Sequence, residues 1–218
     1  MVEFNVEAGL PNPHALARAA SILRDGGIVA YPTDTLYGLA ADPGSAAAMA
    51  QLYRIKGRPV DLAIPLIASG LEQIEAAGGE LGPATRRLAE VFWPGPLTLI
   101  LPGWAGLDAR VHAGLGTVAV RVPDHPVARL LAALCGWPIT STSANRSGEP
   151  ATRDPEEVRR TLGARLDGLV DAGPSPGGRP STIVDARGGV PRLVRAGAVP
   201  WDRVLECLQE TQPPGVTS

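Results

Sequence analysis

Two cations lie close together in the sequence Lys56-Gly57-Arg58-Pro59. Lys56 is the only lysine in the chain, since the other 19 of the 20 basic residues are arginines. A lysine ammonium is a compact charge with three rotatable donors, which the flat guanidinium of arginine does not imitate. Pro59 favours an extended backbone at Arg58, which would put both cations on one side. The pair suits a polyphosphate; a single surface lysine without a role is the alternative.

A second cation lies inside a predicted strand, Thr117–Val122. Its alternating pattern places Val118, Val120 and Val122 on one face and Thr117 with Arg121 on the other. An arginine on the inner part of a sheet is costly unless it is solvated or paired with an anion. The pattern therefore favours an anion site at Arg121, with the exposed face of an antiparallel sheet as the alternative.

Hydroxyl and amide side chains dominate residues 139–145, where five of the seven residues carry one. If Ile139–Ser143 is one strand that continues in the same sense, Ser141, Ser143 and Asn145 share a side. Closely spaced hydroxyls suit phosphate or carboxylate oxygens, which accept several hydrogen bonds at once. Local turn bonding by these side chains is the alternative.

Other kinds of site lack a pattern in this sequence. Neither standard glycine-rich phosphate loop occurs. The three histidines are scattered among turn residues, and Cys135 and Cys207 are far apart with no CxxC spacing. We therefore expect no catalytic triad, no metal ion held by protein side chains, and reduced, buried thiols.

The elements that must position these residues alternate between helix and strand. Predicted helices are 12–25, 45–55, 83–92, 126–135, 155–162 and 201–209; predicted strands are 27–32, 65–68, 97–101, 117–122, 139–143, 169–171, 181–185 and 192–195. Mixed helices and strands with short connections indicate a layered α/β domain. We predict one domain over residues 1–210 and a flexible tail over 211–218. The Gly/Pro-rich stretch Gly173–Pro180 is a candidate lid.

Bulk composition restricts the function classes. The 218 residues carry a net charge of −2 and only 4% aromatic residues, which argues against a nucleic-acid-binding module that relies on a basic surplus and stacking side chains. The start of the chain has no signal-peptide pattern, and no stretch approaches the roughly 18 apolar residues of a membrane span. A cytoplasmic protein without a membrane segment is expected.

Taken in order, several short motifs resemble the YrdC-like family, from about Gly27 to Ala198. Each motif is weak alone, but their ordered combination is specific. They are Tyr31-Pro32-Thr33-Asp34-Thr35-Leu36-Tyr37-Gly38-Leu39, Lys56-Gly57-Arg58-Pro59, Trp93-Pro94-Gly95-Pro96-Leu97-Thr98, Val118-Ala119-Val120-Arg121-Val122-Pro123, Ser143-Ala144-Asn145-Arg146-Ser147-Gly148, Ser181-Thr182-Ile183-Val184-Asp185 and Arg195-Ala196-Gly197.

This resemblance implies a twisted mixed sheet flanked by helices around a deep basic cavity. It implies a nucleotidyltransferase that makes threonylcarbamoyl-AMP and pyrophosphate from ATP, L-threonine and bicarbonate. Mg²⁺ would be held mainly through the phosphates. Separate transfer proteins would then pass the threonylcarbamoyl group to tRNA, to which the chain itself could bind weakly.

Site residues follow from the same motifs. Threonine would be held by Thr35, Arg121, Ser141 and Ser181. ATP would be held by Lys56, Arg58, Thr117, Ser143, Asn145 and Arg195, with Lys56 and Arg58 as the catalytic pair. The sequence departs from the family at Leu62, Ile67 and Ala151, where many or some members have Asn, His and Ser, so contacts there would be apolar or through the backbone.

Three alternatives remain open at this point. The first is an RNA-binding module of the same fold without synthase activity. The second is a non-synthesising paralogue, which should lack the Lys56 and Arg58 pair. The third is a carbamoyl-transfer module of hydrogenase maturation, which should carry further domains.

Overall fold

The computed structural model describes residues 1–7, 10–57, 62–188 and 190–209. Arg58 and the predicted tail 211–218 lie outside these ranges. The helices are α1 (Pro13–Arg24), α2 (Ala46–Lys56), α3 (Leu71–Ala76), α4 (Pro83–Phe92), α5 (Ala109–His112), α6 (Pro126–Cys135), α7 (Pro155–Leu162), the 3₁₀ turn η1 (Gly163–Arg165) and α8 (Trp201–Gln209). The strands are β1 (Val2–Asn5), β2 (Val29–Pro32), β3 (Tyr37–Ala40), β4 (Leu66–Ile67), β5 (Leu97–Pro102), β6 (Thr117–Arg121), β7 (Ile139–Thr140), β8 (Thr142–Ser143), β9 (Gly168–Asp171), β10 (Thr182–Asp185) and β11 (Arg192–Arg195).

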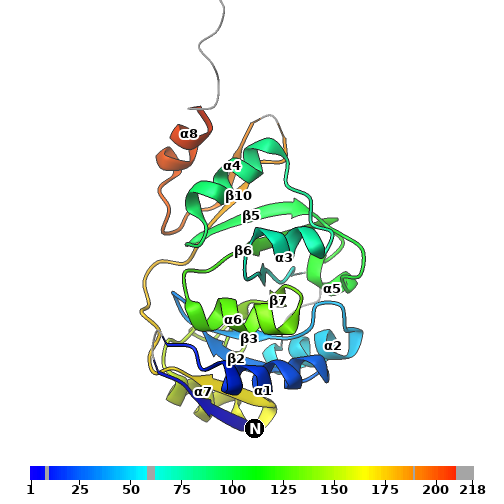
Figure 1. Cartoon of the computed structure of the whole chain (residues 1–218), viewed down its shortest axis with the longest axis vertical. Helices are drawn as coiled ribbons and strands as arrows, with labels where there is room; N and C mark the ends of the chain where they lie inside the picture. Colours follow the sequence, from blue (N-terminus) through cyan, green and yellow to red (C-terminus); the bar gives the residue numbers. More distant parts are fainter. Residues whose placement is uncertain (8–9, 58–61, 189, 210–218) are drawn as a thin grey trace, which may run out of the picture.

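The described strands form two mixed sheets rather than the single sheet expected. One has the order β1-β9-β2-β3-β8, and the other has the order β11-β10-β5-β6-β4-β7. The predicted α/β fold with flanking helices is confirmed, and the correction concerns only the number of sheets. Figure 1 shows an elongated molecule with β1, α1 and α7 at one end and α4 and α8 at the other.

The predicted strand 139–143 is divided between the two sheets. Its first half, β7, pairs with β4 in the six-stranded sheet, and its second half, β8, pairs with β3 in the five-stranded sheet. Ser141 lies between them, and its backbone N–H donates to the carbonyl of Pro65 at 2.7 Å. The prediction of one continuous strand was therefore wrong, because the chain leaves one sheet and enters the other at Ser141.

Local signals set the helix ends. The Asn12 side chain accepts hydrogen bonds from the N–H groups of His14 and Ala15, and Pro13 takes the first helical position of α1. Ser45 caps α2 in the same way, and Gly57 ends that helix with φ +58°, a conformation that glycine adopts at little cost. These two caps fix where Lys56 lies, at the last helical position of α2.

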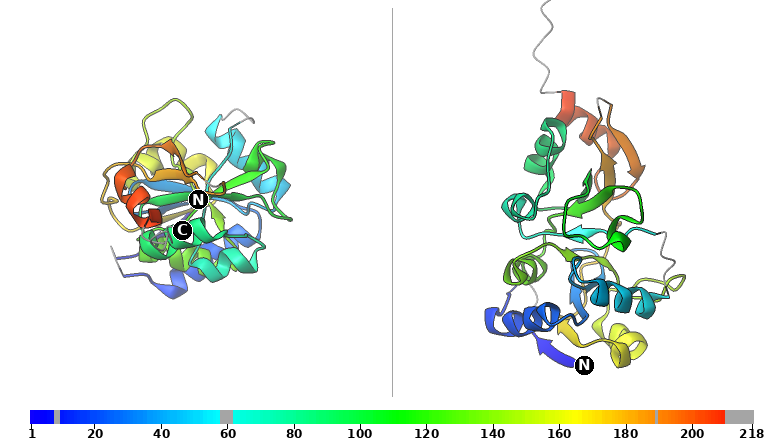
Figure 2. Two further views of the ribbon diagram at one scale, coloured as in Figure 1. Left: turned by 90° about the horizontal axis from the view of Figure 1, so that it is seen from above. Right: turned by 90° about the vertical axis from the view of Figure 1, so that its right-hand side faces the viewer.

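Alternation along β2 produces an apolar layer on each face of the five-stranded sheet. Val29 and Tyr31 pack with α1 and α6, whereas Ile28 and Ala30 contribute to the larger core that includes residues of α2 and α7. Leu97, Leu99 and Leu101 of β5 continue that core toward α4 and α8, which lie side by side in Figures 1 and 2. No helix within the described ranges is long and apolar enough to cross a membrane.

Candidate active site

A cavity of about 320 Å³ lies where the two sheets meet. The five-stranded sheet lines it with residues of the β2–β3 turn, β3 and β8, and the six-stranded sheet with residues of β4, β5 and β6, Arg195 of β11 and Ser181, which precedes β10. Its polar side chains are those of Thr33, Thr35, Tyr37, Thr98, Arg121, Ser141, Thr142, Ser143, Ser181 and Arg195. Hydroxyl donors therefore converge with two guanidinium groups on one space.

The turn between β2 and β3 is built on Thr33. The Thr33 hydroxyl accepts hydrogen bonds from the N–H groups of Thr35 and Leu36, both at 3.2 Å, and donates to the carbonyl of Leu36 at 2.7 Å. Threonine commonly forms such local side-chain to backbone bonds in turns. The turn brings Thr35 to the cavity wall and fixes Asp34 beside it.

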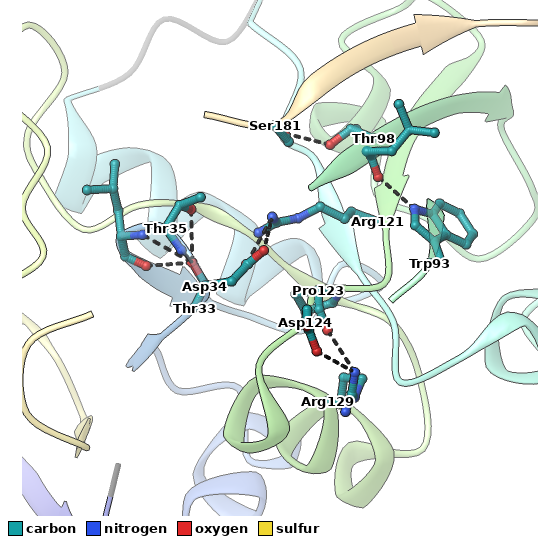
Figure 3. Close-up of polar contacts among 12 residues, drawn as sticks. Thr33, Asp34, Thr35, Trp93, Thr98, Arg121, Pro123, Asp124, Arg129 and Ser181 are labelled. Atoms are coloured by element: carbon teal, nitrogen blue, oxygen red, sulfur yellow. Dashed lines mark hydrogen bonds and ion pairs between the residues drawn. The ribbon is translucent and has the colours of Figure 1, made fainter. Parts of the chain in front are cut away.

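Arg121, which lines the cavity, forms a nearly buried ion pair with Asp34, which does not. One guanidinium nitrogen, Nη1, lies 3.0 Å from Asp34 Oδ1 and 3.1 Å from Oδ2. The side chains of Arg121 and Asp34 are only 8% and 14% exposed, so both charges are largely removed from water. Figure 3 shows Arg121 reaching from β6 toward Asp34, with Ser181 and Thr98 near its stem. Within the described ranges Nε and Nη2 of Arg121 have no hydrogen-bond partner, which leaves donors for an anion.

A second polar chain joins the start of β10 to β11. The hydroxyls of Thr98 and Ser181 are 2.8 Å apart, and Arg195 Nη2 donates to the Ser181 carbonyl at 2.8 Å and to its hydroxyl at 3.0 Å. Burial lowers the pKa of the Arg195 guanidinium, and the charge of Arg121 lowers it further. The two guanidinium groups are thus close enough to repel each other, an arrangement that an anion between them would stabilise.

Residues 141–143 all contribute to the cavity wall, although strand alternation predicted that only Ser141 and Ser143 would do so. Thr142, the first residue of β8 after the crossing between the sheets, also belongs to the lining. Beneath this segment the Tyr31 hydroxyl donates to the carbonyl of Thr140 at 3.2 Å, and burial raises the pKa of Tyr31. The base of the site is therefore a neutral, hydrogen-bonded layer.

Lys56 does not line the cavity but fixes its wall. It is 2% exposed, and its ammonium donates to the carbonyls of Ser143 at 2.5 Å and Asn145 at 2.8 Å and to Asn145 Oδ1 at 3.1 Å. The Ser143 hydroxyl in turn donates to Asn145 Oδ1. Lys56 and Asn145 thus form one network that holds the 143–145 segment in place.

The structure brings together most, but not all, of the sequence-predicted site. Thr35, Ile67, Arg121, Ser141, Ser143, Ala151, Ser181 and Arg195 line the cavity. Thr117 is absent from the lining although it lies on β6 with Arg121, and Leu62 is 46% exposed. Leu62 uses its carbonyl to accept a hydrogen bond from the Tyr53 hydroxyl at 2.7 Å.

The sequence reasoning missed the contributions of Thr33, Asp34 and Thr98. All three stand inside motifs that had been noticed, yet nothing in the sequence marked them as partners of Arg121 and Ser181. A polar residue next to a predicted ligand, in a turn or on a buried strand, is the signal that could have found them.

The arrangement can bind a carboxylate or phosphate and hold it among hydroxyl donors. In the portions of the chain that the structure describes, no group of three or more His, Cys, Asp or Glu side chains could hold a metal ion.

Comparison with known proteins gives a consistent set of relatives. The Sua5/YciO/YrdC family model, described as "Telomere recombination", matches residues 21–197. Threonylcarbamoyl-AMP synthase of Bacillus subtilis is 40% identical over 194 residues, which is 88% of this chain and 56% of that relative. The chain thus spans about half the length of the first such relatives. Threonylcarbamoyl-AMP synthase of Nitrosococcus oceani is 39% identical over 171 residues, which is 78% of this chain and 92% of that relative.

Solved structures agree. The crystal structure of Pyrococcus abyssi Sua5 complexed with L-threonine matches with a TM-score of 0.89 and 33% identity, covering 95% of this chain and 61% of that one. Escherichia coli YciO matches with a TM-score of 0.80 and 29% identity, covering 90% of this chain and 96% of that one.

Proposed function

Because the chain belongs to the Sua5/YciO/YrdC family, we propose that it is a threonylcarbamoyl-AMP synthase, which converts L-threonine, bicarbonate and ATP to threonylcarbamoyl-AMP and pyrophosphate. It would act in the cytoplasm as a nucleotidyltransferase. Its product would be passed by separate transfer proteins to tRNA, to which the chain itself would bind weakly. Support comes from the threonine bound to the Sua5 structure and from the names of relatives that this chain matches along most of their length.

One observation carries the proposal: Arg121, which has unused donors, and Arg195 line the same cavity together with several hydroxyl side chains. Arg121 would bind the carboxylate of threonine through two parallel N–H groups, with Thr35, Ser141 and Ser181 around the amino acid. Arg195 and Ser143 would bind the nucleotide phosphates. Arg58 would also bind phosphate, as the sequence predicts; it lies outside the described residues.

The reaction needs placement more than acid–base groups. The neutral amine of threonine attacks carbon dioxide derived from bicarbonate, a N–C bond forms, and the amine proton is lost to solvent. An anionic carbamate oxygen then attacks the α-phosphorus of ATP, and the bond to pyrophosphate breaks. Guanidinium and hydroxyl donors aimed at the phosphate oxygens stabilise the charge that develops there. Mg²⁺ would enter as part of the substrate, bound to the triphosphate.

Pyrophosphate release from ATP tests the proposal directly. The assay is run complete and then with threonine and bicarbonate omitted in turn. We expect release to depend on both. Release that ignores threonine would contradict the proposal, and salt-dependent tRNA binding in the absence of any threonine-dependent turnover would favour an RNA-binding module instead.

A further inference from the structure

The two arginines of the cavity differ in how their charge is balanced. Arg121 is paired with Asp34 at 3.0 Å and 3.1 Å. Arg195 donates only to Ser181, a neutral residue, and within the described ranges no carboxylate pairs with it. The cavity thus has one half in which the cation is neutralised and one half in which it is not.

Asp34 is held firmly in its place. The hydrogen bonds of Thr33 with Thr35 and Leu36 span the backbone of Asp34, and the Asp34 side chain is only 14% exposed. His125 lies close enough for the charge of Asp34 to act on it, but burial lowers the pKa of His125, so the imidazole is neutral near pH 7. Arg121 is therefore the positive charge that balances Asp34.

Charge balance matters because the two proposed substrates differ in net charge. Threonine is a zwitterion with no net charge, whereas ATP and pyrophosphate carry several negative charges. A bare arginine attracts both a carboxylate and a phosphate, and phosphate would win by its larger charge. An arginine already paired with a carboxylate keeps its hydrogen-bond donors but loses the attraction for a free anion, which gives selectivity by disfavouring the wrong ligand.

We propose that Asp34 is a positioning residue that orients Arg121 and neutralises its charge. The half of the cavity at Arg121 then binds the zwitterionic amino acid and disfavours phosphate. Arg195 keeps its net positive charge and attracts the nucleotide. The inference rests on the proposed function and deepens it. Asp34 itself does not line the cavity, so it acts through Arg121 and not by touching the substrate.

Asp34→Asn removes the charge and keeps the shape of the side chain. We expect the threonine Kd and KM to rise about 10- to 100-fold, the range for loss of a charged hydrogen bond, while the KM for ATP changes less than about threefold. Inorganic phosphate and pyrophosphate should become competitive with threonine. Asp34→Glu keeps the charge, so phosphate should not compete in that variant. A merely structural role would not produce this dependence on charge.

Asp185→Asn is the matched control. Asp185 also pairs with arginines, Arg187 at 2.8 Å and Arg192 at 2.9 Å, but lies outside the cavity lining, so neither Kd for threonine nor phosphate competition should change. A folded Asp34→Asn variant in which phosphate still fails to compete with threonine would overturn the inference.

Calorimetric binding separates this inference from the proposed function. Threonine binding by the wild-type protein is measured with rising phosphate, apart from turnover. We expect millimolar phosphate not to displace threonine; displacement would overturn the inference even if Asp34→Asn fails to fold. Absence of threonine-dependent pyrophosphate release, with threonine binding and its resistance to phosphate intact, would count against the reaction alone.

Discussion

At the scale of single residues, Lys56 shows how one side chain can serve a site without lining it. Its ammonium reaches three oxygens of Ser143 and Asn145, within 2.5 to 3.1 Å. A compact ammonium with rotatable donors can serve acceptors that lie in different directions, whereas a planar guanidinium cannot. The scarcity of lysine in this chain is consistent with a position that arginine would not fill.

Lys56→Met tests this role. Loss of the ammonium leaves the Asn145 carbonyl without this donor and the Ser143 carbonyl with only the Asn145 N–H, so we expect a loss of about 1–3 kcal/mol in the free energy of unfolding. Because Ser143 would shift, kcat/KM for pyrophosphate release should fall by at least about 10². Lys56→Arg should be nearly as defective. Arg54→Met, on the exposed side of the same helix, is the control and should have little effect on either quantity. A fully active Lys56→Arg variant would contradict the assignment.

At the scale of elements, the close approach of β11 to the start of β10 positions Ser181 and Arg195 together. A methyl group added at Gly197 would lie 2.3 Å from the Pro180 carbonyl oxygen and 2.3 Å from the Thr182 nitrogen. The neighbouring Ala198 N–H donates to the same Pro180 carbonyl at 2.9 Å. Glycine is required here by space, because backbone lies against backbone.

Gly197→Ala should therefore affect stability and binding at once. Backbone atoms cannot move aside as a flexible side chain can, so overpacking should cost about 1–3 kcal/mol of unfolding free energy. The displaced Ser181 should also weaken binding of threonine, measured by calorimetry below the melting temperature. Gly188→Ala is the matched control, since its added methyl would meet nothing within 4 Å. Equal threonine affinity in both variants would show that Gly197 does not position the site.

Elements with strong local signals could be predicted from the sequence, and those without them could not. Helices α4, α6, α7 and α8 have the bounds that the sequence predicted; Pro is the first residue of α4, α6 and α7, and Gly follows the last residue of α6 and α7. Strand β1 was missed because its four residues carry no turn signals of their own, and β3 was missed because Gly38 and Ala40 dilute its apolar pattern. The crossing at Ser141 has no sequence signature, since the polar residues on either side are alike.

The residues of the candidate site also divide into those that the sequence could predict and those that it could not. Arg121, Ser141 and Ser143 could be predicted, because a cation or a run of hydroxyls in a strand is unusual on its own, whereas Arg195 was predicted only from the family resemblance. Asp34 could not be predicted, because its role depends on an ion pair with Arg121, which is 87 positions away in the sequence. Thr117 was predicted from the family resemblance, with strand alternation in agreement, and it is not among the residues that line the cavity.

At the scale of the whole molecule, the cavity lies between the two sheets and is lined by both. The chain passes from one sheet to the other at Ser141, and bound ligands would contact both sheets at once. The Gly173–Pro180 connection touches the same region at both of its ends. The Tyr37 hydroxyl donates to the Gly173 carbonyl at 2.8 Å, and Pro180 lines the cavity. Its role as a lid stays a prediction. A ligand that bridges two sheets should stabilise the fold as a unit.

Thermal unfolding with ligands measures this coupling. A ligand at 100 times its dissociation constant stabilises the folded state by about 2.7 kcal/mol, which for a domain of this size corresponds to a rise of about 5–10 °C in Tm. We expect threonine and a non-hydrolysable ATP analogue each to produce such a shift. Under the proposed roles, in which Arg121 binds the amino acid and Arg195 the phosphates, Arg121→Ala should abolish the threonine shift and keep most of the nucleotide shift. Arg195→Ala should do the reverse. Loss of both shifts in either variant would mean that the two halves of the cavity are not separable, and a threonine shift that survives in Arg121→Ala would place the carboxylate elsewhere.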